Sequence, residues 1–253
     1  MDDGALYQRV RHCLRAELEF FAAGKGSRRW EAAGAFACVS PGTPDRSLFN
    51  GVMCDDAAAL ARHYETIARM YDEAGVRAWT VWIDGSDANS SDWLAKRAHT
   101  VDSRPTAMGA VIDSMQLETA HDLDWSETDD MALVARINDA AYNFPPPAFS
   151  ALMDRHAPRW HAYIARATGE PRCCVLTYHA IDGDVGVSAV ATLTEARGTG
   201  LATKLLSAVL AEARKADMTT TTLQASPMGR GVYAKMGYRD LGEMQMWERR
   251  RPA

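Results

Sequence analysis

The stretch "TEARGTGLATKLL", from Thr194 to Leu206, decides how the rest of the chain is interpreted. It is predicted to lead into a helix that ends near Ala216. Two glycines and an arginine lie at the start of this helix, and no carboxylate lies in its first turn. The first turn of a helix has four backbone N–H groups without partners and the positive end of the helix dipole. The stretch therefore indicates a binding site for an anion.

Arg197, Gly198 and Gly200 give this helix start its chemistry. Glycine has no Cβ atom to keep a phosphate away from the amides, and the arginine adds a fork of donors. We interpret "ARGTGLATK" as a pyrophosphate cradle. It is not a P-loop, because no Gly-Lys-Ser/Thr follows, and it is not a Rossmann fingerprint, because the strands before it are predicted to be antiparallel. A glycine turn that only starts a helix is the alternative.

Strands and helices alternate around this stretch. A helix is predicted over 131–142, and a short one over 149–157. Three consecutive antiparallel strands follow, with turns at Gly169-Glu170 and Asp182-Gly183: "WHAYIARATG", "EPRCCVLTYHAIDG" and "DVGVSAVATL". After the cradle and its helix come a Thr-rich strand, "TTTTLQAS", a short helix that Gly237 ends, and a final strand or hairpin, "YRDLGEMQMWERR".

The first half of the chain has the same order: strand, long helix, strand, short helix, strand. Its strand "TVWID" begins at Thr80, about 142 residues before the counterpart "TLQAS". A repeat this long indicates duplicated domains. Because residues 114–130 are polar and acidic, we predict domains over 1–113 and 114–253. The predicted fold class is α+β, with mixed α and β elements.

Composition and charge exclude several classes of protein. Of the 253 residues, 47% are hydrophobic and 24% charged, as in globular proteins, and the net charge of −5 argues against a nucleic-acid binder. The five cysteines fit no metal motif and are expected to be reduced thiols, so no metal is predicted. The start of the chain does not resemble a signal peptide, and no stretch approaches about 18 apolar residues. We expect a cytoplasmic protein without a membrane partner.

Two motifs resemble the GNAT superfamily of N-acyltransferases. Arg197, Gly200 and Ala202 form the pattern Arg-x-x-Gly-x-Ala after a strand, which resembles the acyl-CoA signature of that family. "ASPMGRGVYAKMGYRDLG" resembles its tyrosine helix, with Tyr233 followed by Gly237-Tyr238. The resemblance covers about 65 residues, from Asp184 to Glu248. It implies two GNAT-like domains, each a mostly antiparallel twisted sheet flanked by helices.

The resemblance also implies the residues that bind acetyl-CoA. The strand before the cradle splays from its neighbour and pairs with the pantetheine arm; by position this strand supplies Val190, Ala191 and Thr192. The pyrophosphate would rest beside Arg197 on the amides of Gly198, Thr199, Gly200, Leu201, Ala202 and Thr203. Ser226 lies where the family often has a residue near the pantetheine, although it is also a plain helix N-cap before Pro227.

Tyr233 is the predicted catalytic residue. A phenol beside the sulfur can protonate the departing CoA thiolate, and packing on the core is the alternative role. A backbone N–H of Val190 or Ala191 is expected to hold the oxyanion. Tyr238 is expected to lie in the core.

The general base is not identified. Many relatives have a glutamate early in the pantetheine strand, where this chain has Gly186 and Ser188. Four titratable residues lie nearby in sequence. Asp182 and Asp184 are most simply turn residues, and His179 is most simply a solvated strand end. The sequence indicates no role for Glu195. Water or a carboxylate from another segment remains open.

The first half is expected to lack a cofactor site. Asp55 or Asp56 is predicted to cap its long helix, and two carboxylates there would repel a pyrophosphate. Ser90 or Ser91 is predicted to cap the short helix. We therefore expect a degenerate GNAT-like domain that walls the acceptor pocket, with three candidate tryptophans that also fit a core: Trp79, Trp82 and Trp93.

The sequence thus predicts an N-acetyltransferase that moves an acetyl group from acetyl-CoA to an amine of a small molecule, by direct attack within a ternary complex. Phe144 and Phe149, in "NFPPPAF", either line the acceptor site or belong to a stiff loop. The alternatives are a non-catalytic acyl-CoA-binding or regulatory protein, and another acyl-CoA chemistry such as O-acylation or decarboxylation.

Overall fold

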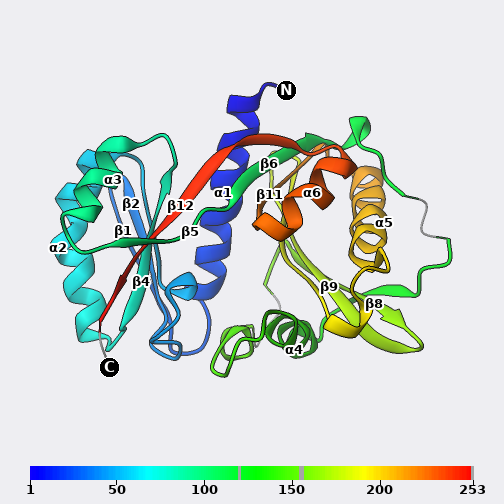
Figure 1. Cartoon of the computed structure of the whole chain (residues 1–253), viewed down its shortest axis with the longest axis horizontal. Helices are drawn as coiled ribbons and strands as arrows, with labels where there is room; N and C mark the ends of the chain where they lie inside the picture. Colours follow the sequence, from blue (N-terminus) through cyan, green and yellow to red (C-terminus); the bar gives the residue numbers. More distant parts are fainter. Residues whose placement is uncertain (119–120, 154–156, 252–253) are drawn as a thin grey trace. The chain divides into compact units, whose positions relative to one another are not determined.

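The computed structural model describes residues 1–118, 121–153 and 157–251. It divides into two compact units. The larger unit consists of Met1–Leu14 and Thr106–Leu241, and the smaller unit consists of Arg15–Pro105 and Gly242–Ala253. Helix α1 (Asp3–Ala22) and strand β12 (Arg239–Arg250) each contribute to both units. Figure 1 gives the labels of the elements.

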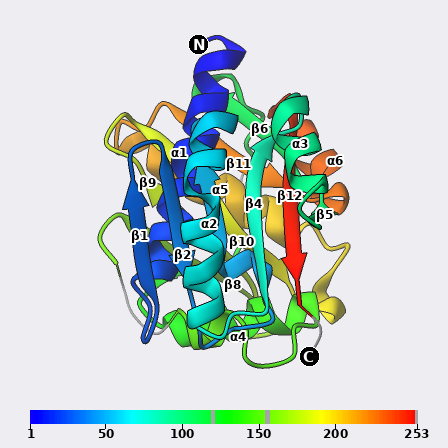
Figure 2. The same cartoon turned by 90° about the vertical axis from the view of Figure 1, so that its left-hand side faces the viewer.

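The sheet of the smaller unit has the strand order β1-β2-β3-β4-β12, and β5 also pairs with β12. Only β3 and β4 are parallel, and helix α2 connects them. The short helix α3 follows β4, and Figure 2 shows α2 lying over the strands. The bounds are β1 Arg28–Ala32, β2 Ala35–Val39, β3 Gly51–Cys54, α2 Ala57–Glu73, β4 Ala78–Asp84, α3 Ala88–Ala95 and β5 Thr100–Ser103, with a 3-10 turn at Ser47–Phe49.

An aspartate side chain caps the start of helix α2. Asp56 Oδ1 accepts from the Ala59 N–H at 2.7 Å, which confirms the predicted cap. The predicted cap of α3 is wrong: Asp87, not Ser90 or Ser91, accepts from the Ser90 N–H at 3.0 Å. An aspartate one turn earlier competes well for this position, because Asp and Ser are equally good caps.

The three tryptophans that the sequence suggested as a pocket wall differ in burial. Trp79 is 2% exposed and stacks on Tyr71 with ring centroids 4.9 Å apart, so it is a core residue. Trp82 is also buried. Trp93 is half-buried, and the Arg97 guanidinium lies 3.5 Å from its ring centroid.

The sheet of the larger unit has the strand order β6-β11-β10-β9-β8-β7. Strands β8, β9 and β10 are consecutive and antiparallel, as predicted, and only β10 and β11 are parallel. Helix α5 connects β10 to β11, and α6 follows β11. The bounds are β6 Thr106–Val111, β7 Trp125–Thr128, α4 Met131–Tyr142, β8 Trp160–Ala167, β9 Glu170–His179, β10 Asp184–Thr192, α5 Leu201–Lys215, β11 Thr220–Ala225 and α6 Pro227–Met236.

Short 3-10 turns lie at Ile112–Ser114, Phe149–Ala151 and Thr194–Ala196. The second replaces the short helix predicted over 149–157, of which 154–156 lie outside the described residues. Among the described residues, no helix has both the length and the apolar character needed to cross a membrane.

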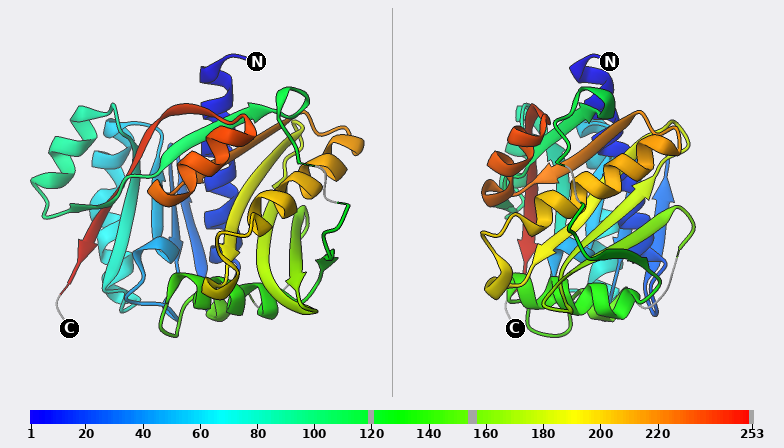
Figure 3. Two further views of the ribbon diagram at one scale, coloured as in Figure 1. Left: turned by 45° about the vertical axis from the view of Figure 1, so that its right-hand side comes forward. Right: turned by 90° about the vertical axis from the view of Figure 1, so that its right-hand side faces the viewer.

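Helices cover both faces of the larger unit's sheet. Figure 3 shows α5 along one face, where its apolar side packs on Val187 and Leu223. Helix α4 lies on the other face, where the Cys174 Sγ approaches the Val134 carbonyl oxygen at 3.7 Å. The first half of α1 also packs on the sheet.

The two units exchange their last strands. Strand β6 pairs antiparallel with β11 over six residue pairs in the larger unit, although it follows the smaller unit in sequence. Strand β12 pairs with β4 from Met244–Asp84 to Arg250–Ala78 in the smaller unit, although it follows the larger one. The units therefore differ from the contiguous segments 1–113 and 114–253 that the sequence suggested. In each unit, one strand of the parallel pair therefore has a distant segment as its second neighbour: β6 pairs with β11, and β12 pairs with β4.

The expected fold class is confirmed: both sheets are mostly antiparallel and carry helices. Each unit contains a parallel strand pair joined by a long helix and followed by a short helix. The order of elements predicted for the two halves is therefore present in both.

Removal of Gly242–Ala253 should unfold the smaller unit and spare the larger one. The deletion removes the β12–β4 ladder and exposes the core that Met244 and Met246 help to fill, a loss of about 3 kcal/mol or more. Limited proteolysis with mass mapping should find rapid cleavage within 15–105. A chain shortened only by Pro252 and Ala253 is the control, and equal resistance of the two chains would contradict the prediction.

Candidate functional site

Strands β10 and β11 separate halfway along their length. Their last residue pair is Val187–Leu223, whereas β10 continues to Thr192 paired only with β9. The β9–β10 register shifts between Ser188 and Ala191, and Ala189 there has a φ of 47°. A left-handed alanine is a strained conformation that tertiary packing must maintain. Beyond Val187, the edge of β10 that faces β11 is therefore open.

The backbone groups of Val190 and Thr192 are directed toward this open edge. The Leu193 N–H donates to the Arg172 carbonyl of β9 at 2.9 Å, so Leu193 and Ala191 are directed toward β9. Neighbouring strand residues direct their backbone groups to opposite edges. The Ala189 carbonyl oxygen lies 3.5 Å from the Cys174 Sγ of β9. In a trans peptide bond the C=O and the following N–H point in opposite directions, so the Val190 N–H points away from β9. Of the two amides proposed for an oxyanion, that of Val190 faces the open edge.

Helix α5 begins without a capping side chain. Gly200 is its N-cap, and the Lys204 N–H donates the first backbone bond to the Gly200 carbonyl at 3.0 Å. Both Gly198 and Gly200 have a φ of +77°, which favours glycine, and a Cβ placed on either would meet no atom within 4 Å. The amides before Lys204 therefore face open space at the positive end of the helix.

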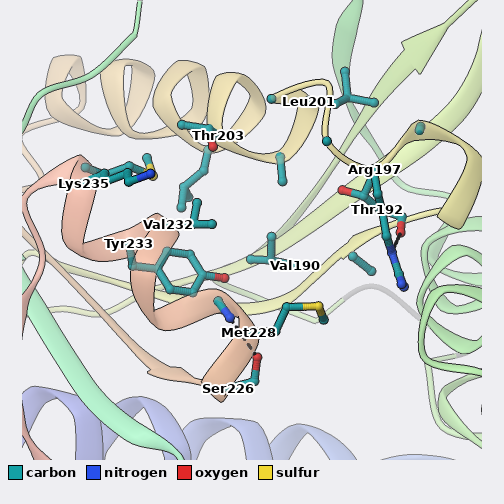
Figure 4. Close-up of a pocket in the computed structure, with 18 of the residues that line it drawn as sticks. Val190, Thr192, Arg197, Leu201, Thr203, Ser226, Met228, Val232, Tyr233 and Lys235 are labelled. Atoms are coloured by element: carbon teal, nitrogen blue, oxygen red, sulfur yellow. Dashed lines mark hydrogen bonds between the residues drawn. The ribbon is translucent and has the colours of Figure 1, made fainter.

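Helix α6 forms the opposite wall. Ser226 caps it by accepting from the Gly229 N–H at 3.2 Å, so the capping role considered from sequence is present. Gly237 ends the helix with a φ of 104°. The Tyr233 side chain is half-buried, and Figure 4 shows its hydroxyl pointing toward Val190. Tyr238 is buried, and its hydroxyl lies 2.8 Å from the Thr221 hydroxyl, so it is a core residue as expected.

These elements enclose one pocket of about 830 Å³ in the larger unit (Figure 4). Its walls come from the 116–118 segment, the end of α4, the open part of β10, the start of α5, and α6. Of the residues predicted to bind the cofactor, all but Thr199 line it: Val190, Ala191, Thr192, Arg197, Gly198, Gly200, Leu201, Ala202, Thr203 and Ser226. The predicted catalytic Tyr233 also lines it. Thr199 instead donates its hydroxyl to the Ala196 carbonyl at 2.8 Å.

Arg197 is oriented differently from the role predicted for it. Its Nε donates to the Thr192 carbonyl at 3.2 Å, and a terminal nitrogen donates to the Ala141 carbonyl at the end of α4. Figure 4 shows the side chain running past Thr192 and away from Leu201. The guanidinium thus connects β10 to α4. Carbonyl oxygens accept hydrogen bonds from a guanidinium, whereas the start of a helix presents N–H donors that do not.

The two aspartates considered as bases do not line the pocket. Asp184 is buried and accepts from the hydroxyls of Thr220 and Thr222 at 2.6 Å each, and burial raises the pKa of its carboxyl. Asp182 lies 3.5 Å from Arg9, in the turn that the sequence predicted.

His179 and Glu195 do not line the pocket either. His179 pairs with Val185, at the opposite end of β10 from the open edge, and Glu195 forms an ion pair with Arg172 at 2.8 Å. Burial, helped by nearby His161, lowers the pKa of His179 to about 4. Within the described ranges, no group of three or more His, Cys, Asp or Glu side chains is arranged to hold a metal ion.

Of the two positions where relatives have a glutamate, Gly186 is sterically closed. A Cβ placed on Gly186 would collide with the Cys13 Sγ and would lie 2.8 Å from the Cys13 Cβ. Helix α1 therefore occupies the space above Gly186, and no side chain larger than hydrogen fits there.

Sequence reasoning missed several polar residues of the pocket: Gln116, Glu118, Tyr142 and Lys235. Glu118 lines it, and the Glu118 N–H donates to the Ser207 hydroxyl at 3.1 Å. Tyr142 lines it from the end of α4 and donates to the Val190 carbonyl at 3.1 Å. The Tyr142 ring stacks on Phe144, and Phe144 stacks on Phe149. The aromatic residues in 142–149 could have pointed to Tyr142 from the sequence. Their stacking order could not be predicted, because it depends on how the segment folds back on itself.

One family model matches part of the chain. Residues 150–248 match the family model described as the acetyltransferase (GNAT) domain. This segment contains the open strand, the helix start and Tyr233. The chain is therefore similar to this family over 99 of its 253 residues. No curated protein matches the chain.

Solved structures share the fold over nearly the whole chain. A GCN5-related N-acetyltransferase from Kribbella flavida is 15% identical, with a TM-score of 0.70 over 95% of both chains. One from Sphaerobacter thermophilus is 15% identical, with a TM-score of 0.61 over 87% of this chain and 78% of that one. A tandem GNAT protein from the clavulanic acid biosynthesis pathway is 11% identical, with a TM-score of 0.61 over 96% of both chains. At these identities the likeness establishes the GNAT fold.

His179 should make the protein less stable in mild acid. Its pKa is about 4 in the folded chain and about 6.5 when unfolded, so its contribution is complete above pH 6.5 and falls as the pH drops toward 4. Urea unfolding at pH 7 and pH 5 should show a smaller loss of stability for His179→Gln than for the wild type. His121→Gln, at an exposed position, is the control, and an unchanged pH dependence in His179→Gln would contradict the assignment.

Proposed function

We propose that the chain transfers an acetyl group from acetyl-CoA to an amine of a small molecule, by direct attack within a ternary complex. One observation supports this most: an open strand edge, an uncapped glycine helix start and a tyrosine hydroxyl line the same pocket. Each feature alone has other uses. Together they match the three parts of an acyl-CoA thioester, namely the arm, the pyrophosphate and the reacting sulfur.

The residues of the pocket fit acetyl-CoA by shape and by charge. The open space at Gly198 and Gly200 would admit a pyrophosphate close to the amides of 198–203. The pantetheine arm would lie along Val190 and Thr192, whose backbone groups face the open edge. Bound acetyl-CoA would supply an activated thioester.

The Val190 N–H and the Tyr233 hydroxyl would assist at the thioester. The amide is fixed by the strained Ala189 conformation and would donate to the thioester oxygen as negative charge develops there. Burial, with smaller effects from Tyr142 and Cys173, raises the pKa of Tyr233 above its usual value. The phenol therefore stays protonated at neutral pH and can donate its proton to the departing sulfur. Water would take the proton that the attacking amine loses, and solvent would reprotonate the phenolate.

We propose that the smaller unit is a degenerate GNAT-like domain without a cofactor site. Asp56 already accepts from one first-turn amide of α2, that of Ala59, and its carboxylate would repel a phosphate. Strands β3 and β4 stay paired through Met53–Trp82, just before α2 begins at Ala57, so β3 has no long open edge. We therefore propose that this unit has a structural role and does not bind acetyl-CoA.

Gly200→Asp should lower the affinity for acetyl-CoA at least about tenfold, and Gly200→Asn much less. Both side chains tolerate the left-handed backbone at a similar cost of about 1 to 2 kcal/mol, so the pair isolates the negative charge beside the pyrophosphate. Calorimetry measures both affinities and the stoichiometry, which should be one per wild-type chain. Equal affinities of the two variants would contradict the cradle, and two sites per chain would contradict the degenerate unit.

Tyr233→Phe should lower kcat at least about tenfold without weakening acetyl-CoA binding. Release of CoA thiol with a panel of small amines measures kcat, and the wild-type rate should not fall through deprotonation of Tyr233 up to about pH 10. Tyr238→Phe is the matched control, because its hydroxyl bonds only within the core at Thr221.

An unchanged kcat in Tyr233→Phe would remove its acid role. Acetyl-CoA binding without thiol release for any amine would favour a binding protein. Mass spectrometry of the product distinguishes N-acylation from O-acylation or decarboxylation.

A further inference from the structure

Tyr142 has no assigned role, yet it bonds to the strand on which the proposed function depends. Its hydroxyl donates to the Val190 carbonyl at 3.1 Å, on the open edge of β10. The pantetheine arm would need this edge, because an added strand takes its affinity from main-chain hydrogen bonds. The Val190 carbonyl thus already has a donor in the position that an amide N–H of the arm would take.

We propose that Tyr142 is a positioning residue that holds the Val190 carbonyl until acyl-CoA binds, and that an amide N–H of the pantetheine arm then replaces its hydroxyl. This inference rests on the proposed function. No covalent bond changes: the Val190 carbonyl exchanges one donor for another, and the Tyr142 hydroxyl becomes available inside the pocket.

The exchange is confined to Val190 by the strength of the neighbouring bonds. The other carbonyl on the open edge belongs to Thr192. The Arg197 guanidinium donates both to this carbonyl and to the Ala141 carbonyl. A charged donor bonded to two carbonyls is harder to displace than one phenol. Tyr142 is also 41% exposed, so its hydroxyl can leave without opening the core.

The position of Tyr142 connects the exchange to the segment after α4. Tyr142 is the last residue of α4, and its ring stacks on Phe144 at 5.7 Å between centroids, with Phe149 next in the stack at 6.2 Å. Loss of the hydroxyl bond removes one link between the end of α4 and β10, and the bond of Arg197 to the Ala141 carbonyl remains. We therefore expect residues 143–153 to loosen when the arm binds.

The sign of the effect on affinity tests the proposal. Tyr142→Phe keeps the ring stack and removes only the competing donor, so acetyl-CoA should bind about three- to tenfold more tightly than to the wild type. ADP has a pyrophosphate but no pantetheine arm, and its affinity should not change. A residue that only supported the fold or contacted the arm would lower the affinity or leave it unchanged.

Calorimetry of the full chain with acetyl-CoA and with ADP measures these affinities. Tyr178→Phe is the matched control, because Tyr178 packs on Trp160 and does not line the pocket. Hydrogen exchange of the peptides over 143–153 should rise on acetyl-CoA binding in the wild type and should be high from the start in Tyr142→Phe.

Unchanged or weaker acetyl-CoA binding by Tyr142→Phe would overturn the inference while the proposed function stands. An equal gain for ADP would also overturn it, because ADP does not reach Val190. Failure of the wild type to bind acetyl-CoA would instead refute the proposed function, and the inference with it.

Discussion

The separation of β10 from β11 after the Val187–Leu223 pair is the constraint on which the pocket depends. Up to that pair the two strands share a ladder, and beyond it β10 is held by β9 on one side only. A strand inside a sheet has no free backbone groups to offer a ligand, whereas an open edge does. The left-handed Ala189 marks the place where the strand changes course, and its strain is maintained by the packing around it.

Side chains from distant parts of the sequence hold this open strand in place. Tyr142 and Arg197 bond to the carbonyls of Val190 and Thr192, and Arg197 also reaches the end of α4. Helix α1 packs against Gly186 through Cys13, which closes the position where a glutamate would otherwise fit. A side chain larger than hydrogen at position 186 would therefore collide with α1.

The two units show how one order of elements can place either an uncapped or a capped helix start after a parallel strand. Each has a parallel strand pair joined by a long helix. In the larger unit that helix begins at an uncapped glycine, and in the smaller unit it begins at Asp56, whose carboxylate satisfies an amide of the first turn. The capping residue decides whether a first-turn amide is satisfied within the helix itself.

The sequence by itself determined the local features: the glycine helix start, a cap at Asp55 or Asp56, the three antiparallel strands, and the GNAT resemblance. Each follows from residues close together in the chain, where backbone preference and hydrogen bonding act over a few positions. Only the tertiary structure decided the exchange of β6 and β12, the course of Arg197 toward Ala141, and the contact of Tyr142 with Val190. These contacts join residues far apart in sequence, and their choice depends on which strand edges and carbonyls the folded chain leaves unpaired.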